Sequence, residues 1–210
     1  MDILLSTTYF GPVQWYQLLH RADAVWMEAH ESYLKQTYRN RCVIGSAAGP
    51  LPLTVPVVAA SNTADRQPSA ADRLITNVMV SDHGNWRHLH WQAITSAYRD
   101  TPFFDYYADD LRPFFFQRDW PTLWLLNKAV CQTVCRLLGI CPQVTATETY
   151  QPAVSHCTDL RLAFSPKTTA SAAPEPGPYW QPFLQRQGFM PGLSILDLLC
   201  CMGPEARLWL

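Results

Sequence analysis

The segment YLKQTYRNR, residues 33–41, gathers three cations and two tyrosines in a chain that is otherwise short of charge. In an extended conformation, the two-residue period of a strand would place Lys35, Arg39 and Arg41 on one face. Two guanidinium groups and an ammonium group held side by side could bind phosphate oxygens, so an anion site is the first hypothesis. The alternative is a solvated surface on which these cations pair with nearby carboxylates.

Two further positions could move a proton. Glu28 follows an apolar, strand-like segment, and the functional groups of open α/β sheets gather where strands end. Its alternative role is a salt bridge to Lys35 or to the arginines. His90 lies on or beside the apolar stripe of a predicted helix, where it could act as a general base or donate to a phosphate. A hydrogen-bonded core histidine is the alternative interpretation there.

The sequence gives no sign of a metal site. His88 and His90 point to different sides of a regular helix, so they cannot share one metal ion. The seven cysteines form no CxxC pair and fall mostly in apolar segments, which is typical of reduced, buried thiols. The Walker A, GxGxxG, GxSxG and HExxH motifs are all missing from the sequence. We therefore expect no metal, and any cofactor stays unknown at this stage.

The first 60 residues alternate between strand and helix signals. Apolar and β-branched runs predict strands, and the apolar spacing after Pro12 predicts a helix. The turn at Gly49-Pro50 should join two strands into a hairpin, and Pro56 should end the second strand or place it at an edge. The predicted strands cover 2–10, 23–30, 41–49 and 51–60, and the helix covers 13–22.

The later part of the chain is mainly helical by pattern, after one further strand candidate at 74–80. Asn85 can cap a helix. The apolar stripe of that helix consists of Trp86, Leu89, Ala93, Ile94 and Ala97. A long amphipathic helix starts near Asp119 and ends at Gly139. A last helix follows Ser194 as its N-cap, with Asp197 in the capping-box position.

Together these signals predict a single mixed α/β domain over residues 1–210, with a strand-rich N-terminal half and helices packed behind it. Two segments, about 60–73 and 165–178, are rich in small, polar or proline residues. Such segments have little to bury, so we predict that they are surface loops.

Composition narrows the classes of partner. Lys and Arg number 16 against 17 Asp and Glu, for a formal net charge of −1. A nucleic-acid-binding domain is normally strongly basic, so nucleic acid is an unlikely partner, although a tRNA contact through residues 33–41 would still show as salt-dependent binding. No apolar run reaches the roughly 18 residues of a membrane span, and the N-terminus lacks a signal-peptide pattern. We therefore expect a cytoplasmic protein with no membrane span.

Several linked motifs resemble the WbqC-like proteins of bacteria. The resemblance begins with TTYFGPVQWYQLLHRADAVWMEAHESYLKQTYRNRCVI and continues through LTVPV, SDHGNW and PFF. Within it, K-x-x-Y-x-N-R matches Lys35, Tyr38, Asn40 and Arg41, and T-V-P matches residues 54–56. The ending GFMPGLSILDLLCCMGPEA is similar to a branch of the family common in Bacteroides-like bacteria. The chain departs from the usual pattern at Thr7-Thr8, where many members have Gln-Pro, and at Glu28-Ala29, where they have paired acids.

The resemblance implies a role in making bacterial surface polysaccharide such as O-antigen. The implied activity is a transferase that moves an aminoacyl or acyl group to an amino sugar. It would use a phosphorylated small-molecule donor or a sugar nucleotide, with His90 or Glu28 moving the proton. The predicted substrate-binding residues are Lys35, Tyr38, Arg39, Asn40, Arg41, Tyr9 and Trp86. The alternative is an accessory protein that binds a saccharide or nucleotide on aromatic side chains and makes no bond. The oligomeric state is left open.

Overall fold

The computed structural model of the chain describes residues 1–58, 69–166 and 177–210. Most of the two predicted loops, 60–73 and 165–178, therefore lies outside the described residues. Of the first loop, the described end contains a short 3-10 helix at Ala71–Arg73. No helix in the described ranges is both long enough and apolar enough to cross a bilayer.

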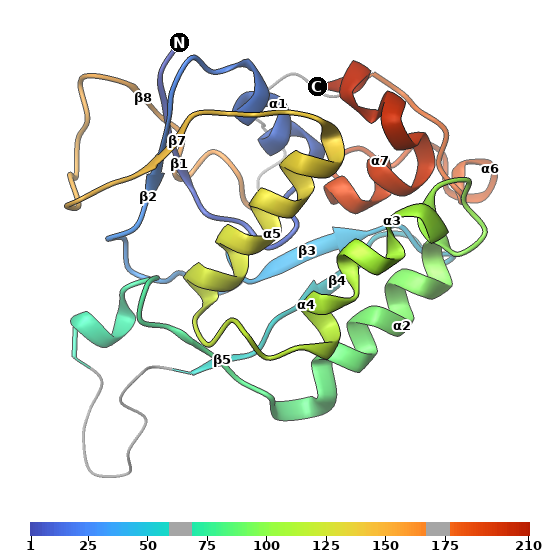
Figure 1. The fold of residues 1–210 in the computed structure, drawn as a ribbon, viewed down its shortest axis with the longest axis horizontal. Coiled ribbons are helices and arrows are strands. Elements are labelled where there is room, and N and C mark those ends of the chain that lie inside the picture. The colour runs from blue at the N-terminus through green and yellow to red at the C-terminus, as the bar shows by residue number, and fades with distance from the viewer. Residues whose placement is uncertain (59–68, 167–176) are drawn as a thin grey trace.

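A four-stranded parallel sheet organises the molecule (Figure 1). Its strands are β1 (Ile3–Ser6), β2 (Val25–Glu28), β7 (Val144–Ala146) and β8 (Thr158–Asp159), in the order β7-β2-β1-β8. β1 and β2 are in register, with Ser6 opposite Glu28 at the last pair. Because all four strands run the same way, their carboxyl ends meet at one edge, the edge at which open α/β sheets bind ligands.

Side chains alternate between the two faces of this sheet, and the faces differ in character. Ile3, Leu5, Val25 and Met27 are buried and share one face. Trp26 and Glu28 lie on the other face, opposite Leu4 and Ser6. The sheet thus has an apolar face, which helix α5 (Leu123–Leu138) partly covers, and a second face that becomes polar toward its carboxyl edge.

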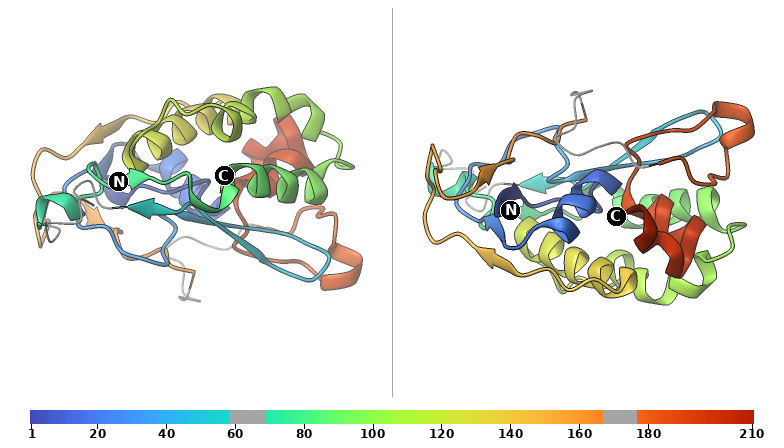
Figure 2. Two further views of the ribbon diagram at one scale, coloured as in Figure 1. Left: turned by 90° about the horizontal axis from the view of Figure 1, so that it is seen from below. Right: turned by 90° about the horizontal axis from the view of Figure 1, so that it is seen from above.

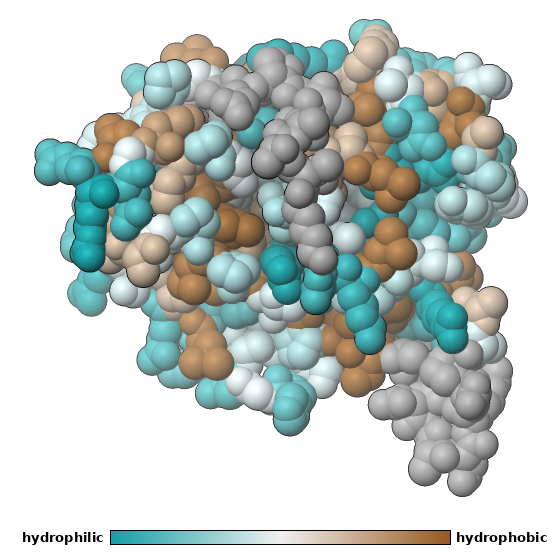
Figure 3. All heavy atoms as spheres, turned by 180° about the vertical axis from the view of Figure 1, so that it is seen from behind, coloured by the Kyte–Doolittle hydropathy of each residue, from teal (hydrophilic) through white to brown (hydrophobic). Residues whose placement is uncertain are grey.

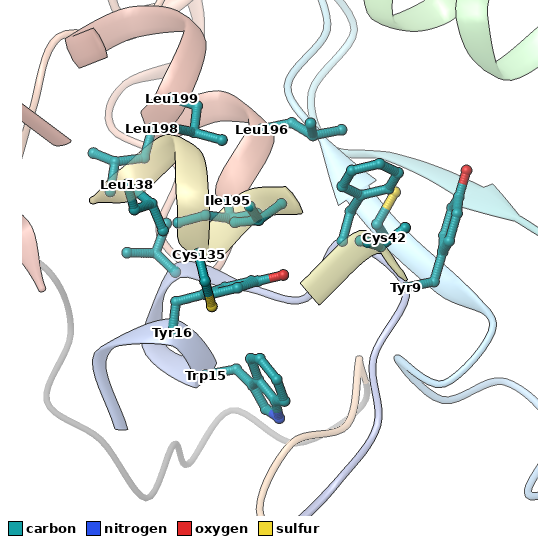
Figure 4. Packing of buried hydrophobic residues seen from close by; sticks show 14 of the residues in the cluster. Tyr9, Trp15, Tyr16, Cys42, Cys135, Leu138, Ile195, Leu196, Leu198 and Leu199 are labelled. Atoms are coloured by element: carbon teal, nitrogen blue, oxygen red, sulfur yellow. The ribbon is translucent and has the colours of Figure 1, made fainter. Parts of the chain in front are cut away.

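Three helices form the core beside the apolar face. They are α1 (Val13–Arg21), α5 (Leu123–Leu138) and α7 (Ile195–Met202). In Figure 4, Tyr16 of α1, Cys135 and Leu138 of α5 and Ile195 of α7 lie in one packed group. The start of α5 is capped by Thr122, whose hydroxyl accepts from the Leu125 amide, and α5 ends at Gly139 with a φ of 65°. The predicted long helix and its end at Gly139 are confirmed, but the helix begins at Leu123, with Thr122 rather than Asp119 at its start.

A β-hairpin and a second group of helices complete the fold. The hairpin consists of β3 (Arg41–Ile44) and β4 (Leu51–Thr54), and it confirms the turn predicted at residues 49–50. Figure 2 shows α5 on one side of the molecule and this hairpin on the other. The remaining elements are β5 (Val57–Val58), β6 (Met79–Val80), α2 (Trp86–Tyr98), α3 (Phe104–Leu111), α4 (Pro113–Phe116), α6 (Leu184–Gln187) and the 3-10 helices His83–Asn85 and Gly203–Trp209.

The mixed α/β class is confirmed, but several local predictions need correction. The buried side of α2 carries Trp86, His90, Ile94 and Tyr98, whereas Leu89 is 56% exposed. Asn85 precedes α2 with a φ of 49°, yet its side chain makes no capping bond. The strand expected over 74–80 is reduced to the two residues of β6.

The largest correction concerns residues 33–41, which are not extended. Residues 35–40 form successive turns and bends, with Gln36 at a φ of 59°, and β3 begins only at Arg41. A left-handed residue inside the segment breaks the two-residue alternation. Lys35, Arg39 and Arg41 therefore do not line one face of a strand.

Candidate functional site

Polar side chains gather at the carboxyl edge of the parallel sheet. Ser6, Glu28 and Asp159 are the last residues of β1, β2 and β8. Arg39 reaches the same edge from the turn before β3, and Arg161 follows β8 by two residues. Figure 3 shows the side of the molecule turned away from α5, where apolar side chains are scattered among polar ones.

The first part of this cluster is built around the buried guanidinium of Arg39. Its Nε donates to Glu31 Oε1 at 2.7 Å, and its Nη2 donates to the Ser6 hydroxyl at 2.7 Å. Ser6 also lies 2.9 Å from Glu31 Oε2, to which it can donate. Arg39 is only 3% exposed and Glu31 6% exposed, so the two charges stabilise each other away from water.

The second part joins Glu28 to Arg161. Arg161 Nη1 donates to Glu28 Oε2 at 2.9 Å, and the same guanidinium binds Asp159 at 2.6 Å. The hydrogen bond from Arg161 lowers the pKa of Asp159, and Asp159 in turn raises the pKa of Arg161. On its other oxygen, Glu28 accepts from the Thr147 hydroxyl at 2.8 Å and from the His30 amide at 2.9 Å.

These contacts neutralise the arginines of the cluster. Three carboxylates, from Glu28, Glu31 and Asp159, face two guanidinium groups. Of the cations predicted to form a clamp, only Arg39 reaches this edge, and its charge is paired with that of Glu31. Lys35 is exposed on the turn, and Arg41 donates from Nε to the Thr54 hydroxyl at 3.0 Å. The structure therefore does not bring the three cations together.

The motif around Asn40 instead holds the turn in place. Asn40 Nδ2 donates to the Val55 carbonyl at 2.8 Å, and the Asn40 carbonyl accepts from the Val55 amide at 2.8 Å. Asn127 of α5 donates to the carbonyl of Arg39 at 2.7 Å. The K-x-x-Y-x-N-R and T-V-P motifs are thus two halves of one contact, which fixes the side chain of Arg39 at the sheet edge.

His90 lies in a different environment from Glu28. It is buried on α2, with Nδ1 3.1 Å from the Tyr9 hydroxyl and its ring 5.0 Å from that of Trp86. Burial lowers the pKa of His90 to about 4, so its ring is neutral at pH 7. None of its contacts among the described residues involves Glu28. The predicted residues His90, Tyr9 and Trp86 form one packed group, and Tyr9 is fully buried within it.

A hollow of about 420 Å³ opens next to Glu28 on the polar face of the sheet. Trp26 and His156 form an aromatic wall, with ring centroids 5.9 Å apart and planes at 86°. The other lining residues are Leu4, Glu28, Thr145, Ala146, Thr147, Glu148, Thr149, Gln151 and Val154. An aromatic wall with carboxylate, hydroxyl and amide groups around it is a surface that suits a sugar.

A much smaller recess, of about 10 Å³, lies at the same edge. Its lining includes Ser6, Thr7, Thr8, Tyr38, Arg39 and Arg161. Thr8 is 4% exposed, and its hydroxyl has no hydrogen-bond partner among the described residues. A buried hydroxyl of this kind is unusual, because buried polar groups are normally paired.

The amino end of α1 is not available to a ligand, although it follows β1 directly. The Val13 amide donates to the Leu193 carbonyl at 3.1 Å, and the Ser194 hydroxyl donates to the Phe10 carbonyl at 2.7 Å. The Ile195 amide donates to the Gly11 carbonyl at 2.9 Å. Since residues 193–195 occupy this helix terminus, α1 does not offer its amino end to a phosphate at the edge.

The cysteines and acids of the described ranges form no group of three or more that could hold a metal ion. The seven cysteines are free thiols. Cys42, Cys135, Cys200 and Cys201 are buried as expected, whereas Cys141 is exposed.

Sequence reasoning selected Glu28, Tyr38 and Arg39, which do lie at this edge, but it missed Thr147, Asp159 and Arg161. Arg161 is 133 residues from the glutamate that it binds. The one local signal is the pattern D-x-R after a short strand, which is too common to identify a site. The recess and the hollow are formed only when distant segments meet.

The fold and this edge define an open α/β protein with a polar site where its parallel strands end. Residues 7–177 match the model of the WbqC-like protein family. The chain belongs to that family. It is 24% identical over 228 residues to a Mycobacterium tuberculosis protein named "Uncharacterized protein Rv1507c", with 97% of this chain and 94% of that protein covered. No solved structure matches the chain.

Proposed function

We propose that the protein is a transferase of bacterial surface-polysaccharide biosynthesis that moves an acyl or aminoacyl group from a phosphorylated donor to an amino sugar. Family membership supports a biosynthetic role. The observation that carries the proposal is the placement of Glu28, a buried carboxylate that nevertheless forms part of the wall of the hollow.

The hydrogen bonds of Glu28 leave it able to accept one more proton donor. A carboxylate has about four acceptor positions. Thr147 and the His30 amide occupy both positions on Oε1, and Arg161 occupies one on Oε2. The remaining position on Oε2 can accept from the amine of a bound sugar. The three fixed donors hold the carboxylate in place, as general-base catalysis requires.

The proposed reaction is attack by the acceptor amine on the donor carbonyl carbon. The carbon–nitrogen bond forms, the bond from that carbon to the phosphate oxygen breaks, and the phosphate leaves with the electron pair. Glu28 takes the proton that the nitrogen loses. In this scheme the sugar ring packs on Trp26, and the donor approaches Glu28 at the carboxyl edge of the sheet.

The remaining predicted residues have supporting roles in this proposal. Asn40 and Arg41 hold the turn that carries Arg39, through Val55 and Thr54. The buried group of His90, Tyr9 and Trp86 has a structural role, and Lys35 contributes positive charge at the surface. We assign the proton transfer to Glu28 rather than to His90, because Glu28 lines the hollow.

The test is the Glu28→Gln variant. We expect transfer from an acyl phosphate to an amino sugar to fall by about 10²–10⁴-fold, the range typical of a lost general base. Binding of the amino sugar, followed by thermal shift or calorimetry, should change much less, because Trp26 and the other walls remain. Glu205→Gln, at an exposed position in the last 3-10 helix, is the matched control and should retain full activity.

The aromatic wall also supports a second candidate, an accessory protein that binds a saccharide without catalysis. The two are separated by one pair of measurements. Amino-sugar binding that depends on Trp26, with no transfer from any phosphorylated donor and no effect of Glu28→Gln, would favour the accessory protein.

A further inference from the structure

A second, larger hollow lies on the opposite face of the sheet, between α5 and strands β2 and β7. Its volume is about 600 Å³. It is within the range of small-molecule sites in proteins, which are mostly apolar with a few placed polar groups. The lining residues are Thr7, Met27, Trp124, Lys128, Cys131, Gln132, Cys135, Arg136, Gly139, Ile140, Cys141, Pro142, Val144 and Ala146.

The α5 side of this hollow is a long, narrow stripe. Trp124, Lys128, Cys131, Cys135 and Gly139 recur at steps of three and four residues, which places them along one side of the helix. At 1.5 Å per residue the stripe is roughly 20 Å long. Met27, Val144 and Ala146 line the facing side, since alternate residues of β2 and β7 point this way. The shape suits an extended chain rather than a compact ring.

The two thiols in the stripe form part of the apolar wall of the hollow. The Sγ atoms of Cys131 and Cys135 are 4.0 Å apart. Their hydrogen bond, together with burial, raises the pKa of Cys131. A thiol of this kind is neutral at pH 7 and behaves as a small hydrophobic group.

The charged residues of the hollow all have the same sign. Lys128 and Arg136 line it, and the lining contains no acid. Arg136 is tied to Asp110 at 2.8 Å, whereas Lys128 is exposed and has no ion pair within the described ranges. An apolar groove with an unpaired cation complements a molecule that has an apolar chain and an anionic head.

One end of the hollow adjoins the candidate active site. Because α5 leads back into β7, its amino end lies toward the carboxyl edge of the sheet. Thr7 lines both this hollow and the recess next to Arg39, and Ala146 lines both this hollow and the one next to Glu28. A chain lying along α5 with its head at Lys128 would therefore present that head near the edge where Glu28 lies.

We propose that this hollow binds the apolar tail of a single-chain anionic amphiphile, with its phosphate at Lys128, and that this amphiphile is the acyl donor. The proposal rests on the proposed function for the donor role, but the binding of the amphiphile can be measured without it. The transferred group would then be a linear acyl chain, and chain length would be read along the stripe of α5.

The binding test compares dodecyl phosphate with dodecanol, both below the concentration at which they aggregate. We expect dodecyl phosphate to bind and raise the melting temperature. Lys128→Ala should weaken that binding by about tenfold, the effect of one lost charge contact of roughly 1.4 kcal/mol. The same variant should leave the weaker binding of dodecanol unchanged. Arg186→Ala, an exposed cation on α6, is the matched control.

A second variant fills the groove. Val144 is 42% exposed on the edge strand β7. It lines this hollow but not the hollow next to Glu28. Val144→Trp should block both amphiphiles while keeping the fold, because tryptophan is tolerated in strands. Equal affinity for the phosphate and the alcohol, or binding that Val144→Trp does not change, would overturn the proposal. So would a concentration-dependent dimer that Val144→Trp abolishes, since the face would then be a contact between copies.

A short donor separates this inference from the proposed function. Acetyl phosphate has no tail to place in the groove. If Glu28-dependent transfer from acetyl phosphate occurs equally in the parent and in Val144→Trp, and neither amphiphile binds, the groove proposal fails while the transferase proposal stands. If amphiphiles bind as expected but no acyl phosphate of any length reacts, the donor role fails and the binding site remains.

Discussion

At the scale of single residues, the site is a set of charges that are stable only in pairs. Arg39 with Glu31 and Arg161 with Glu28 are buried, and each pair is reinforced by a hydroxyl or amide. Removing one partner of such a pair leaves an unpaired charge out of water, whereas removing both partners costs much less. The pairs therefore fix the geometry of the edge more than they add to stability.

This gives a prediction for Arg39. Arg39→Met should reduce the free energy of unfolding by about 3–5 kcal/mol, because Glu31 is left buried without its partner. Adding Glu31→Gln should restore much of that loss. Arg136→Met, which breaks the exposed pair with Asp110, should change stability by less than about 1 kcal/mol. Urea unfolding of the parent and the three variants measures the difference, and a small effect of Arg39→Met alone would contradict the buried-pair interpretation.

At the scale of elements, the close approach of Gly203 to Phe103 fixes where α7 ends. Gly203 has a φ of 56°, and a Cβ built there would lie 2.4 Å from the Phe103 ring. Phe103 is bound to α7 through its amide, which donates to the Cys200 carbonyl at 3.1 Å. The absence of a side chain at Gly203 thus permits both the backbone turn that follows α7 and the close packing of Phe103, the residue before α3.

Two glycine substitutions separate these requirements. Gly192 also has a positive φ, 75°, but nothing lies within 4 Å of a Cβ built there. Gly192→Ala should cost about 1–2 kcal/mol from the backbone alone. Gly203→Ala should cost that amount plus about 1–3 kcal/mol for the overlap with Phe103. Thermal unfolding of both variants provides the check, and equal losses would show that the ring moves aside freely.

The same elements show what local sequence can predict. α5, α7 and the β3–β4 hairpin follow from apolar period, caps and glycine turns, because those signals lie within a few residues. The turn before β3 cannot be predicted from such local signals, because it depends on hydrogen bonds to Glu31, Val55 and Asn127. Asp197 illustrates the limit within a correct element. It is fully buried and accepts from Tyr179 and Gln181 instead of closing a capping box.

The candidate site was predictable only in part, for the same physical reason. Glu28 was accessible to prediction because strand ends in α/β sheets are where functional groups collect. Arg161 and Thr147 join it across 133 and 119 residues of chain. No local pattern specifies which distant segments meet. The two large hollows, which need both faces of the sheet to be formed, were likewise outside the reach of sequence reasoning.

At the scale of the whole molecule, buried titratable groups tie stability to pH. His90 is neutral in the folded protein because burial lowers its pKa from 6.5 to about 4. The unfolded chain binds a proton at this position as pH falls below 6.5, whereas the folded chain does not until about pH 4. The stabilising contribution is therefore present above pH 6.5 and is lost as pH falls toward 4.

The predicted size of that loss is about 3 kcal/mol between pH 6.5 and 4. Burial also raises the pKa of Asp197, and this change makes the folded protein more stable as pH falls through the acid range. Because that effect opposes the effect of His90 on stability, the measurement should compare variants. Denaturant unfolding of His90→Gln should show a shallower decline over this pH window than the parent. His88→Gln, an exposed neighbour, should follow the parent. Parallel curves for all three proteins would contradict the buried neutral histidine.

The contact between residues 193–195 and the start of α1 has a consequence for how the molecule is assembled. β1 and α1 are synthesised long before α7, and the terminus of α1 is completed by hydrogen bonds with a segment made about 180 residues later. Contacts so far apart along a chain slow folding, because a long loop must close before they form. The opening β-α unit should therefore remain incompletely ordered on the ribosome, and protection of its amides should appear only after α7 has emerged.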